Sequence, residues 1–195
     1  MIRFFDIVFS FLGLLILSPF FILISLLIAL SSKGPIFFLQ TRVGFHGNDF
    51  RLIKFRTMHL DADKKGLLTV GGRDSRITSV GYFLRKFKLD ELPQLINVLF
   101  GSMSLVGPRP EVRKYVDLYT PEQKMVLNAK PGITDYASLE YFNENELLAK
   151  SNDPEKTYIH EVMPAKLELN KRFIENRSVG IYFSIIFRTI GKIIS

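Results

Sequence analysis

The N-terminal part of the chain carries a long run of apolar residues that no charge interrupts. This run extends from Ile7 to Leu30. At ~1.5 Å of rise per residue, a helix of that length reaches about 36 Å, which exceeds the ~30 Å hydrocarbon core of a bilayer. The run is also much longer than the apolar segment of a signal peptide. The pattern therefore predicts a membrane helix near the N-terminus.

A Ser-Pro pair interrupts this run near its middle. Pro19 has no N–H to donate and its ring crowds the carbonyl group of Leu15, whereas the Ser18 hydroxyl is able to pair with a freed carbonyl. Two topologies stay open: a kinked helix that crosses the bilayer, and a bent, re-entrant segment whose ends leave on one face. Kinks are common in spanning helices, which favours the crossing form. Basic residues at both ends, Arg3 and Lys33, favour the re-entrant form if both ends are cytoplasmic.

The C-terminal stretch Ile181–Ser195 is also apolar, but it is patterned. Its polar residues recur at helical spacing and form one narrow stripe: Ser184, Arg188, Lys192 and Ser195. Such a helix suits the membrane interface, where the basic stripe faces the headgroups and the aliphatic side chains enter the lipid. An amphipathic helix packed on a protein core gives the same pattern, so both interpretations stay open.

Two β-rich runs follow the apolar segment, Pro35–Val43 and Phe50–Met58, with a glycine-containing loop between them. This arrangement predicts a β-hairpin. In the second run Lys54 and Arg56 share one face, because side chains alternate along a strand. Two neighbouring cations need an anionic partner or water, so the pair marks either a binding surface or a solvated edge.

Helical periodicity begins after a glycine- and charge-rich segment, Asp61–Arg76, which is expected to be a flexible loop. The first expected helix covers Val80–Phe87 and carries Arg85 on its last turn. A second helix is expected to begin near Asp90, with Glu91 also in its first turn. The helix dipole stabilises carboxylates at that position, and simple capping explains an isolated Asp-Glu pair better than catalysis does.

A Pro-Arg-Pro element places an arginine on a stiff backbone. Pro110 restricts Arg109 to extended geometry, and Pro108 stiffens the approach. A guanidinium held in this way suits a phosphate group, and the alternative is a structural turn with an ion-paired arginine. Downstream, Lys130–Thr134 is expected to be a turn, and Asp135–Lys150 either a substrate-facing loop or an exposed amphipathic helix.

Composition narrows the classes of function. The chain has 195 residues, 26 Lys and Arg against 19 Asp and Glu, a net charge of +7, and 47% hydrophobic residues. A basic surface suits nucleic acid, an anionic membrane or phosphate-bearing substrates, and the apolar N-terminus favours the last two. Because the chain has no Cys, disulfides, thiolate zinc sites and cysteine nucleophiles are excluded. Its three His residues show no metal-ligand spacing.

Several of these features recur as blocks in a fixed order along nearly the whole chain. They are Ser18-Pro19, Gly34–Phe38, Arg42–Gly44, Lys54–Met58, Leu89–Leu95, Ser104–Glu111 and Lys130–Thr134. Together the blocks resemble the monotopic phosphoglycosyl transferases, bacterial sugar transferases that act on undecaprenyl phosphate and begin surface polysaccharide and glycoprotein assembly. The chain is similar to the small form of this family.

The resemblance implies an α+β fold that is mostly helical, with a small β-hairpin, an N-terminal re-entrant membrane helix and interfacial amphipathic helices. The expected domains are an anchor over residues 1–33, broken at Ser18 and Pro19, and a catalytic domain over residues 34–195 that ends in the interfacial helix. The re-entrant form then replaces the crossing form. The implied location is the bacterial inner membrane, with the catalytic domain on the cytoplasmic face.

The resemblance also implies a set of site residues and partners. Asp90 and Glu91 are expected to be the catalytic carboxylates, with Asp90 also a ligand of Mg²⁺. Substrate contacts are expected from Lys54, Arg56, Arg85, Pro108, Arg109 and Pro110. The expected donor is a UDP-sugar and the expected acceptor a polyprenyl phosphate, with membrane lipids around the anchor and no nucleic acid. A homo-oligomer stays open.

An aspartate nucleophile suits this reaction, because the donor pyrophosphate and the lipid phosphate repel each other. Asp90 is expected to attack the sugar-bearing phosphorus and release UMP, after which the lipid phosphate takes the phosphosugar. An Asp with a pKa near ~3.9 is already ionised at neutral pH. The cations and Mg²⁺ neutralise the phosphate charge. Glu91 either helps to hold the metal or orients the acceptor phosphate.

One departure from the family pattern leaves the sugar open. After Lys130–Thr134 many members continue with Gly-Trp-Ala-Gln, whereas this chain has Asp135–Ser138. Two rival functions remain. A membrane-bound glycosyltransferase moves the sugar without its phosphate and releases UDP. A non-enzymatic, membrane-anchored basic adaptor binds acidic lipids or partners, and Asp90 has no role in it.

Overall fold

The computed structural model describes residues 1–60, 62, 68 and 74–194. Its α-helices are α1 (Ile2–Ser31), α2 (Ser79–Lys86), α3 (Gln94–Phe100), α4 (Arg113–Val116), α5 (Tyr136–Glu140), α6 (Glu144–Ala149), α7 (Pro154–Thr157), α8 (Met163–Glu175) and α9 (Val179–Ile194). The strands are β1 (Phe37–Val43), β2 (Asp49–Phe55), β3 (Ser104–Val106) and β4 (Gly132–Thr134). The expected α+β class is confirmed. The loop expected over Asp61–Arg76 lies largely outside the described residues.

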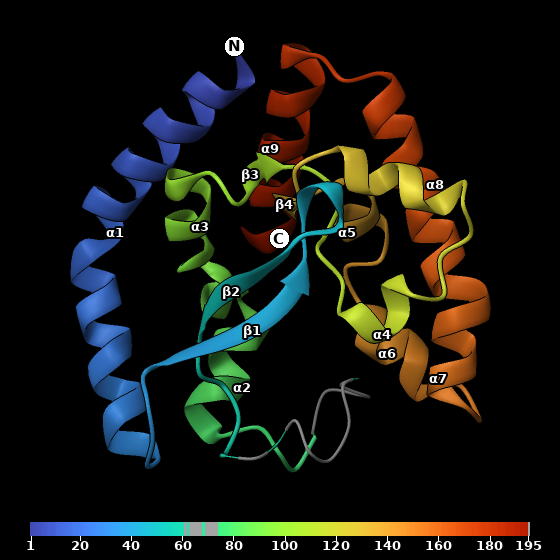
Figure 1. Cartoon of the computed structure of the whole chain (residues 1–195). Helices are drawn as coiled ribbons and strands as arrows, with labels where there is room; N and C mark the ends of the chain where they lie inside the picture. The colour runs from blue at the N-terminus through green and yellow to red at the C-terminus, as the bar shows by residue number, and fades with distance from the viewer. Residues whose placement is uncertain (61, 63–67, 69–73, 195) are drawn as a thin grey trace.

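The apolar segment forms one continuous helix, α1, along one side of the molecule (Figure 1). Helical structure continues through Ser18 and Pro19, which permits a bend at the proline, and the membrane break expected there stays a prediction. Pro19 has no N–H for the carbonyl oxygen of Leu15, and Ser18 Oγ donates to that oxygen instead, at 2.8 Å. Over the described residues, α1 is the one helix long and apolar enough to cross a membrane.

The first turns of α1 are fixed to the rest of the chain by polar contacts. Arg3 donates to the carbonyl oxygens of Val98 and Leu99, at 2.6 and 2.9 Å. Asp6 is buried, and its Oδ1 accepts hydrogen bonds from the hydroxyls of Ser104 and Tyr182, both at 2.9 Å. A carboxylate buried in an apolar helix is costly unless it is paired in this way. These contacts hold the N-terminal end of α1 against α3, β3 and α9.

The other end of α1 is fixed by Arg56, which follows β2. Its guanidinium donates to the carbonyl oxygens of Lys33 and Ser32, at 2.6 and 2.8 Å. A cation at a helix C-terminus is favourable, because the last carbonyl groups have no partner within the helix. Both ends of α1 therefore contact the same polar domain.

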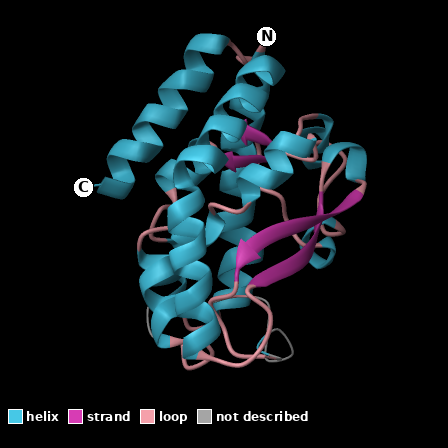
Figure 2. Cartoon of the chain, turned by 90° about the vertical axis from the view of Figure 1, so that its left-hand side faces the viewer, coloured by secondary structure: helices cyan, strands magenta, loops and turns pink. Residues whose placement is uncertain are grey.

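The predicted hairpin is confirmed as the antiparallel pair β1–β2, with Phe37 opposite Phe55 and Val43 opposite Asp49. It ends earlier than expected on the second strand. Figure 2 shows the hairpin beside the helices and apart from the smaller strand pair β3–β4.

The segment expected to be a turn at Lys130–Thr134 contains a strand, so that expectation is wrong. Gly132–Thr134 forms β4, which pairs in parallel with β3. Two glycines permit this close approach. A Cβ added at Gly132 would lie 2.1 Å from the backbone nitrogen of Gly107. The Pro-Gly sequence therefore reflects backbone proximity to a distant strand.

Gly132→Ala is expected to destabilise the protein by roughly 1–3 kcal/mol, because its methyl group meets backbone that cannot rotate away. Thermal unfolding in detergent micelles measures this effect. Gly191→Ala is the control, since no atom lies within 4 Å of a Cβ at that position. Equal unfolding temperatures for the two variants would contradict the close approach of β3 and β4.

Helix α9 packs on the core, as one of the two interpretations of its sequence expected, and its place at the membrane interface stays a prediction. Tyr182 and Ile185 are fully buried against the core. The same helix exposes large apolar side chains at Phe187, Ile190 and Ile194. α9 is thus packed on the domain by one face and leaves a second apolar face uncovered.

Candidate active site

The carboxylate pair lies in a 3₁₀ turn, Leu89–Glu91, that precedes α3. α3 itself begins at Gln94, and no side chain caps its first turn. The capping role considered for Asp90 and Glu91 is therefore not what the structure shows. Both carboxylates have other environments, and the two environments differ.

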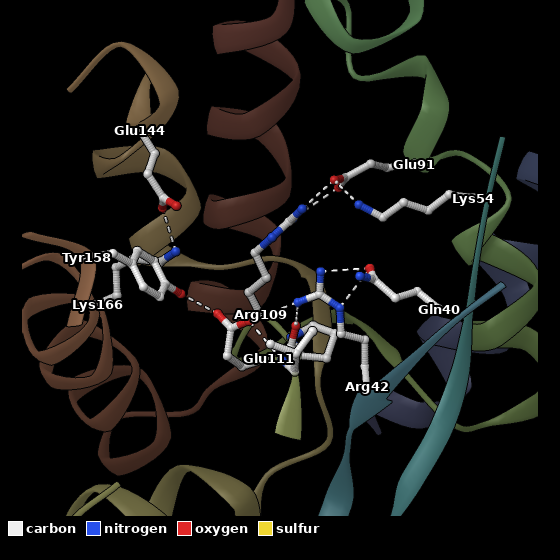
Figure 3. A network of polar contacts seen from close by, with 11 residues as sticks. Gln40, Arg42, Lys54, Glu91, Arg109, Glu111, Glu144, Tyr158 and Lys166 are labelled. Atoms are coloured by element: carbon white, nitrogen blue, oxygen red, sulfur yellow. Dashed lines mark hydrogen bonds and ion pairs between the residues drawn. The ribbon is translucent and has the colours of Figure 1, made fainter. Parts of the chain in front are cut away.

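Glu91 lies between two cations from distant elements (Figure 3). Lys54 Nζ on β2 is 2.9 Å from Glu91 Oε1, and Arg109 Nη1 donates to Oε2 at 3.0 Å. Arg109 Nη2 also pairs with Oε1, so the arginine binds the carboxylate with both arms of its fork. The two cations that the sequence placed in separate motifs thus meet at one carboxylate.

These contacts influence the protonation states of Glu91, Arg109 and Lys54. Burial opposes ionisation of Glu91, but Arg109 and Lys54 outweigh burial and hold the pKa of Glu91 well below its usual range. The Glu91 charge in turn raises the pKa of Arg109. Burial lowers the pKa of Lys54, although Glu91 opposes that change. Glu91 is therefore a fixed anion that holds two cations in place.

Asp90 has a contrasting environment. Asp90 is 7% exposed, and its carboxylate makes no hydrogen bond or ion pair within the described part of the chain. Burial raises the pKa of Asp90, an effect that Lys54 opposes and the adjacent Glu91 charge reinforces. A desolvated carboxylate with unused lone pairs is suited to attack an electrophile.

Asp90 lines two cavities. The first has a volume of about 320 Å³ and a basic lining that includes Arg42, Lys54 and Arg109. The second has a volume of about 380 Å³ and contains many aliphatic side chains. Arg85 also lines both cavities, as expected for a substrate contact. The sequence prediction thus placed Lys54, Arg85, Asp90, Glu91 and Arg109 in one site.

The Pro-Arg-Pro element positions Arg109 from behind. Pro108 and Pro110 are buried, whereas Arg109 is partly exposed. The Pro108 carbonyl oxygen accepts the N–H of Gly132 at 3.0 Å, and the Pro110 carbonyl oxygen accepts Arg42 at 3.1 Å. Among the described residues, the walls of the two large cavities do not include either proline. Their expected contact with substrate stays a prediction, and their observed role is to hold Arg109.

Arg56 differs from the expectation that it binds phosphate. It lines the basic cavity, but it is only 5% exposed and its terminal nitrogens donate to the end of α1. Lys54 and Arg56 therefore do not share one anionic partner, although they share a strand face. Its expected contact with phosphate stays a prediction.

A second polar cluster supports the basic cavity, and sequence reasoning did not identify it (Figure 3). Glu111 accepts from Arg42 at 3.0 Å and from the hydroxyl of Tyr158. Gln40 Oε1 also accepts from Arg42 Nη2, at 2.8 Å. Burial and the Glu111 charge raise the pKa of Tyr158, so its hydroxyl remains a proton donor. The cluster fixes Arg42 in the cavity wall.

The carboxylates of this site suit a magnesium ion that is held by one protein ligand together with substrate, and they do not suit a metal held by several protein ligands. Among the described residues, no group of three or more His, Asp or Glu side chains is positioned to hold a metal. Both Glu91 oxygens are bound by cations, whereas no group in the described part of the chain bonds the Asp90 oxygens. Mg²⁺ commonly uses one carboxylate together with substrate phosphates. Asp90 is therefore the residue that suits this ion.

Arg109→Lys is expected to weaken the binding of a nucleoside diphosphate about tenfold, because the point charge of an ammonium group replaces the two-armed fork of a guanidinium group. Isothermal titration with UDP measures the change. The matched control is Arg113→Lys, since Arg113 forms an exposed ion pair with Asp49 away from the cavities. Unchanged affinity in Arg109→Lys would mean that Arg109 serves only to pair with Glu91.

Comparison with known proteins adds independent information. The model of a family described as bacterial sugar transferase matches residues 1–195. A UDP-N-acetylgalactosamine-undecaprenyl-phosphate N-acetylgalactosaminephosphotransferase from Aeromonas hydrophila is 36% identical over 193 residues, covering 97% of this chain and 43% of that protein. A UDP-glucose:undecaprenyl-phosphate glucose-1-phosphate transferase from Escherichia coli is 37% identical over 195 residues, covering 96% and 39%.

A third relative is closer in length. The UDP-glucose:undecaprenyl-phosphate glucose-1-phosphate transferase of Caulobacter vibrioides is 34% identical over 196 residues, covering 99% of this chain and 69% of that protein. By contrast, the chain spans about two fifths of the first two relatives. The stated identities therefore describe only the matched part of each of those two proteins.

Proposed function

Because the chain belongs to the bacterial sugar transferase family, we propose that it transfers a sugar 1-phosphate from a UDP-sugar to a polyprenyl phosphate. The observation that carries the proposal is the pairing of unlike carboxylates. Asp90 is desolvated and has no hydrogen-bond or ion-pair partner among the described residues, and it adjoins Glu91, which holds Lys54 and Arg109. The names of three relatives, which are transferases acting on undecaprenyl phosphate, support the same reaction class.

The reaction runs in two displacements. An Asp90 oxygen attacks the sugar-bearing phosphorus, the bond from that phosphorus to the bridging oxygen breaks, and UMP leaves with that oxygen. An oxygen of the lipid phosphate then attacks the same phosphorus, and the aspartate carboxylate is released unchanged. The sugar's anomeric bond is not touched in either step. Because both substrates are anionic, the cations around Asp90 offset the repulsion between them.

Lys54, Arg85 and Arg109 supply this charge neutralisation from the protein. Arg109 is pre-oriented by Glu91, so little reorganisation is needed when phosphate arrives. A Mg²⁺ ion bound at Asp90 would offset part of the negative charge on the phosphate oxygens.

Analysis of the released nucleotide tests the proposal. The purified full chain in lipid nanodiscs is incubated with undecaprenyl phosphate, Mg²⁺ and a panel containing UDP-glucose and UDP-N-acetylgalactosamine. We expect UMP and a lipid-linked pyrophosphosugar. Release of UDP would instead indicate a glycosyltransferase that leaves the phosphate behind. Membrane binding without nucleotide release from a broad panel would favour the non-enzymatic adaptor.

We also propose that α1 enters and leaves the membrane on one face, the cytoplasmic face of a bacterial inner membrane. α1 has 30 residues and is therefore about 45 Å long. Its first turns contact Ser104 and Tyr182, and its last residues contact Arg56. If α1 crossed the ~30 Å core, these contacts would have to lie on opposite sides of the bilayer.

A cysteine added before Met1 is expected to react with a membrane-impermeant maleimide only from the cytoplasmic side. The native chain has no Cys, so the background is clean. Asp117→Cys is the matched control, because Asp117 lies on the exposed surface of the polar domain. Labelling of the two cysteines from opposite sides would show that α1 crosses the membrane and would overturn the one-face topology.

A further inference from the structure

The second cavity beside Asp90 has a lining unlike that of the first. Its aliphatic residues come from the Asp90 turn and α3, from the strand pair and from α9: Leu92, Leu95, Leu105, Ile133, Ile186, Ile190 and Ile193. The basic cavity has Arg42, Arg56 and Arg76 in its lining, and none of these lines the second cavity. Lys54, Arg85 and Arg109 line both cavities, so Asp90 adjoins two cavities that share a charged wall, and the second cavity adds an aliphatic wall.

The aliphatic compartment is continuous with the uncovered face of α9. Ile190 lines the cavity and is itself 49% exposed. Ile194, one turn further along α9, is 79% exposed, and Phe187 is 68% exposed. A route of apolar side chains thus leads from the surface of α9 to Asp90. Exposed apolar surface of this kind is expected where a protein meets lipid.

Lys88 lies at the polar edge of this cavity, two residues before Asp90. Its φ of 55° places it in the left-handed region, which is uncommon for a residue with a side chain. Among the described residues its ammonium group has no hydrogen bond or ion pair, and it lies 5.1 Å from the centroid of the Phe142 ring. This partly buried ammonium group is therefore positioned to pair with an anionic ligand in the cavity.

We propose that this cavity, termed the aliphatic cavity, is the acceptor subsite, with Lys88 binding the lipid phosphate and the α9 isoleucines contacting the first isoprene units. The inference rests on the proposed function and adds to it the place where the acceptor lies. In this arrangement, the donor occupies the basic cavity and the acceptor phosphate approaches Asp90 from the aliphatic cavity. Asp90 is then accessible to both substrates in turn without either one passing the other.

The donor's sugar is the competing occupant of the aliphatic cavity. A sugar presents hydroxyl groups, which lose hydrogen bonds with water where they face the aliphatic wall, although not where they face polar lining residues such as Ser138 and Glu144. Thr134 and Thr189, which also line the cavity, pair with each other at 2.7 Å. An isoprenoid chain matches the aliphatic wall without this loss.

The test uses two pairs of variants in the full chain, reconstituted in nanodiscs with undecaprenyl phosphate as acceptor. Ile193 lines the cavity, whereas Leu118 is an exposed apolar residue outside both cavities, so Ile193→Asn and Leu118→Asn make a comparable change inside and outside the proposed subsite. Likewise Lys88→Met removes the cavity lysine, and Lys86→Met removes an exposed one from α2. Release of UMP is measured while donor and acceptor concentrations are varied separately.

We expect Ile193→Asn and Lys88→Met each to raise the acceptor KM about tenfold, since each removes a contact with the lipid or its phosphate. The donor KM should change less than about twofold, and both control variants should match the native chain. A raised donor KM with an unchanged acceptor KM would assign the cavity to the sugar and overturn the inference. Equal acceptor KM values within each pair would overturn it as well.

Failure of the underlying function gives a different result. If the native chain releases no UMP with any UDP-sugar and undecaprenyl phosphate, the proposed reaction itself is wrong. If the native chain releases UMP and the paired variants do not differ, only the acceptor subsite is wrong.

Discussion

Asp90→Asn is expected to lower UMP release by at least about 10³-fold, because the amide keeps the size of the carboxylate and loses its nucleophilic charge. The stability of the folded state should not decrease. Burial raises the pKa of Asp90, which means that the ionised form is disfavoured where it stands. Removing that charge should leave the unfolding temperature unchanged or slightly higher, as is common when a strained functional group is replaced.

Two measurements separate catalysis from structure in this variant. Mass spectrometry of the native chain with donor and without acceptor should show an adduct of one phosphosugar, and Asp90→Asn should show none. Asp117→Asn makes the same chemical change on the exposed surface and should retain full activity. If Asp90→Asn kept more than about a tenth of native turnover, Asp90 would not be the nucleophile.

Local patterns in the sequence predicted the elements whose signals are local. The hairpin β1–β2 follows from alternation and an intervening loop, and α2 follows from helical spacing. The strand β4 does not have such a signal. It has three residues, and it exists because Gly107 and Gly132 let two distant segments approach. A short parallel pair is a tertiary interaction that propensity does not encode.

The residues of the site divide in the same way, into those that a local motif identifies and those that only the tertiary structure brings together. The motifs named Asp90, Glu91 and Arg109, since each stands in a short recognisable block. They did not predict the cluster around Glu111, whose partners Arg42 and Tyr158 are 69 and 47 residues away along the chain. The contact of Arg56 with the end of α1 was not predicted for a related reason, because backbone carbonyls leave no mark in the sequence.

The apolar helix α1 shows why membrane topology does not follow from local sequence alone. Pro19 does remove a hydrogen bond, and Ser18 does replace it at Leu15. Both effects were expected from the sequence, and together they leave open whether the segment crosses the membrane or re-enters. The topology is instead supported by contacts at the two ends of the helix, through Asp6 and Arg56, which no local pattern reveals.

Glu91→Gln is expected to cost about 3–5 kcal/mol of folding free energy at pH 7, because it leaves two buried cations without their anion. The Gln amide can accept one hydrogen bond, but it cannot offset the charges of Lys54 and Arg109. Glu122→Gln breaks an exposed pair with Lys171 and should show little change. Chemical unfolding of both variants in detergent measures the difference.

The pH dependence of this difference gives a sharper test. Arg109 and Lys54 hold the pKa of Glu91 below its ordinary value of 4.5 despite burial, so the folded state binds a proton at Glu91 less readily than the unfolded state does. The stability that Glu91 contributes is therefore fully present above about pH 5, and it is lost as the pH falls through its lowered pKa. The free energies of unfolding of the native chain and Glu91→Gln should converge in acid, since a protonated Glu91 is also neutral. A difference that stays constant from pH 7 down to the acid limit of folding would mean that the loss in Glu91→Gln arises from packing, and that the ion pairs with Lys54 and Arg109 contribute nothing to the fold.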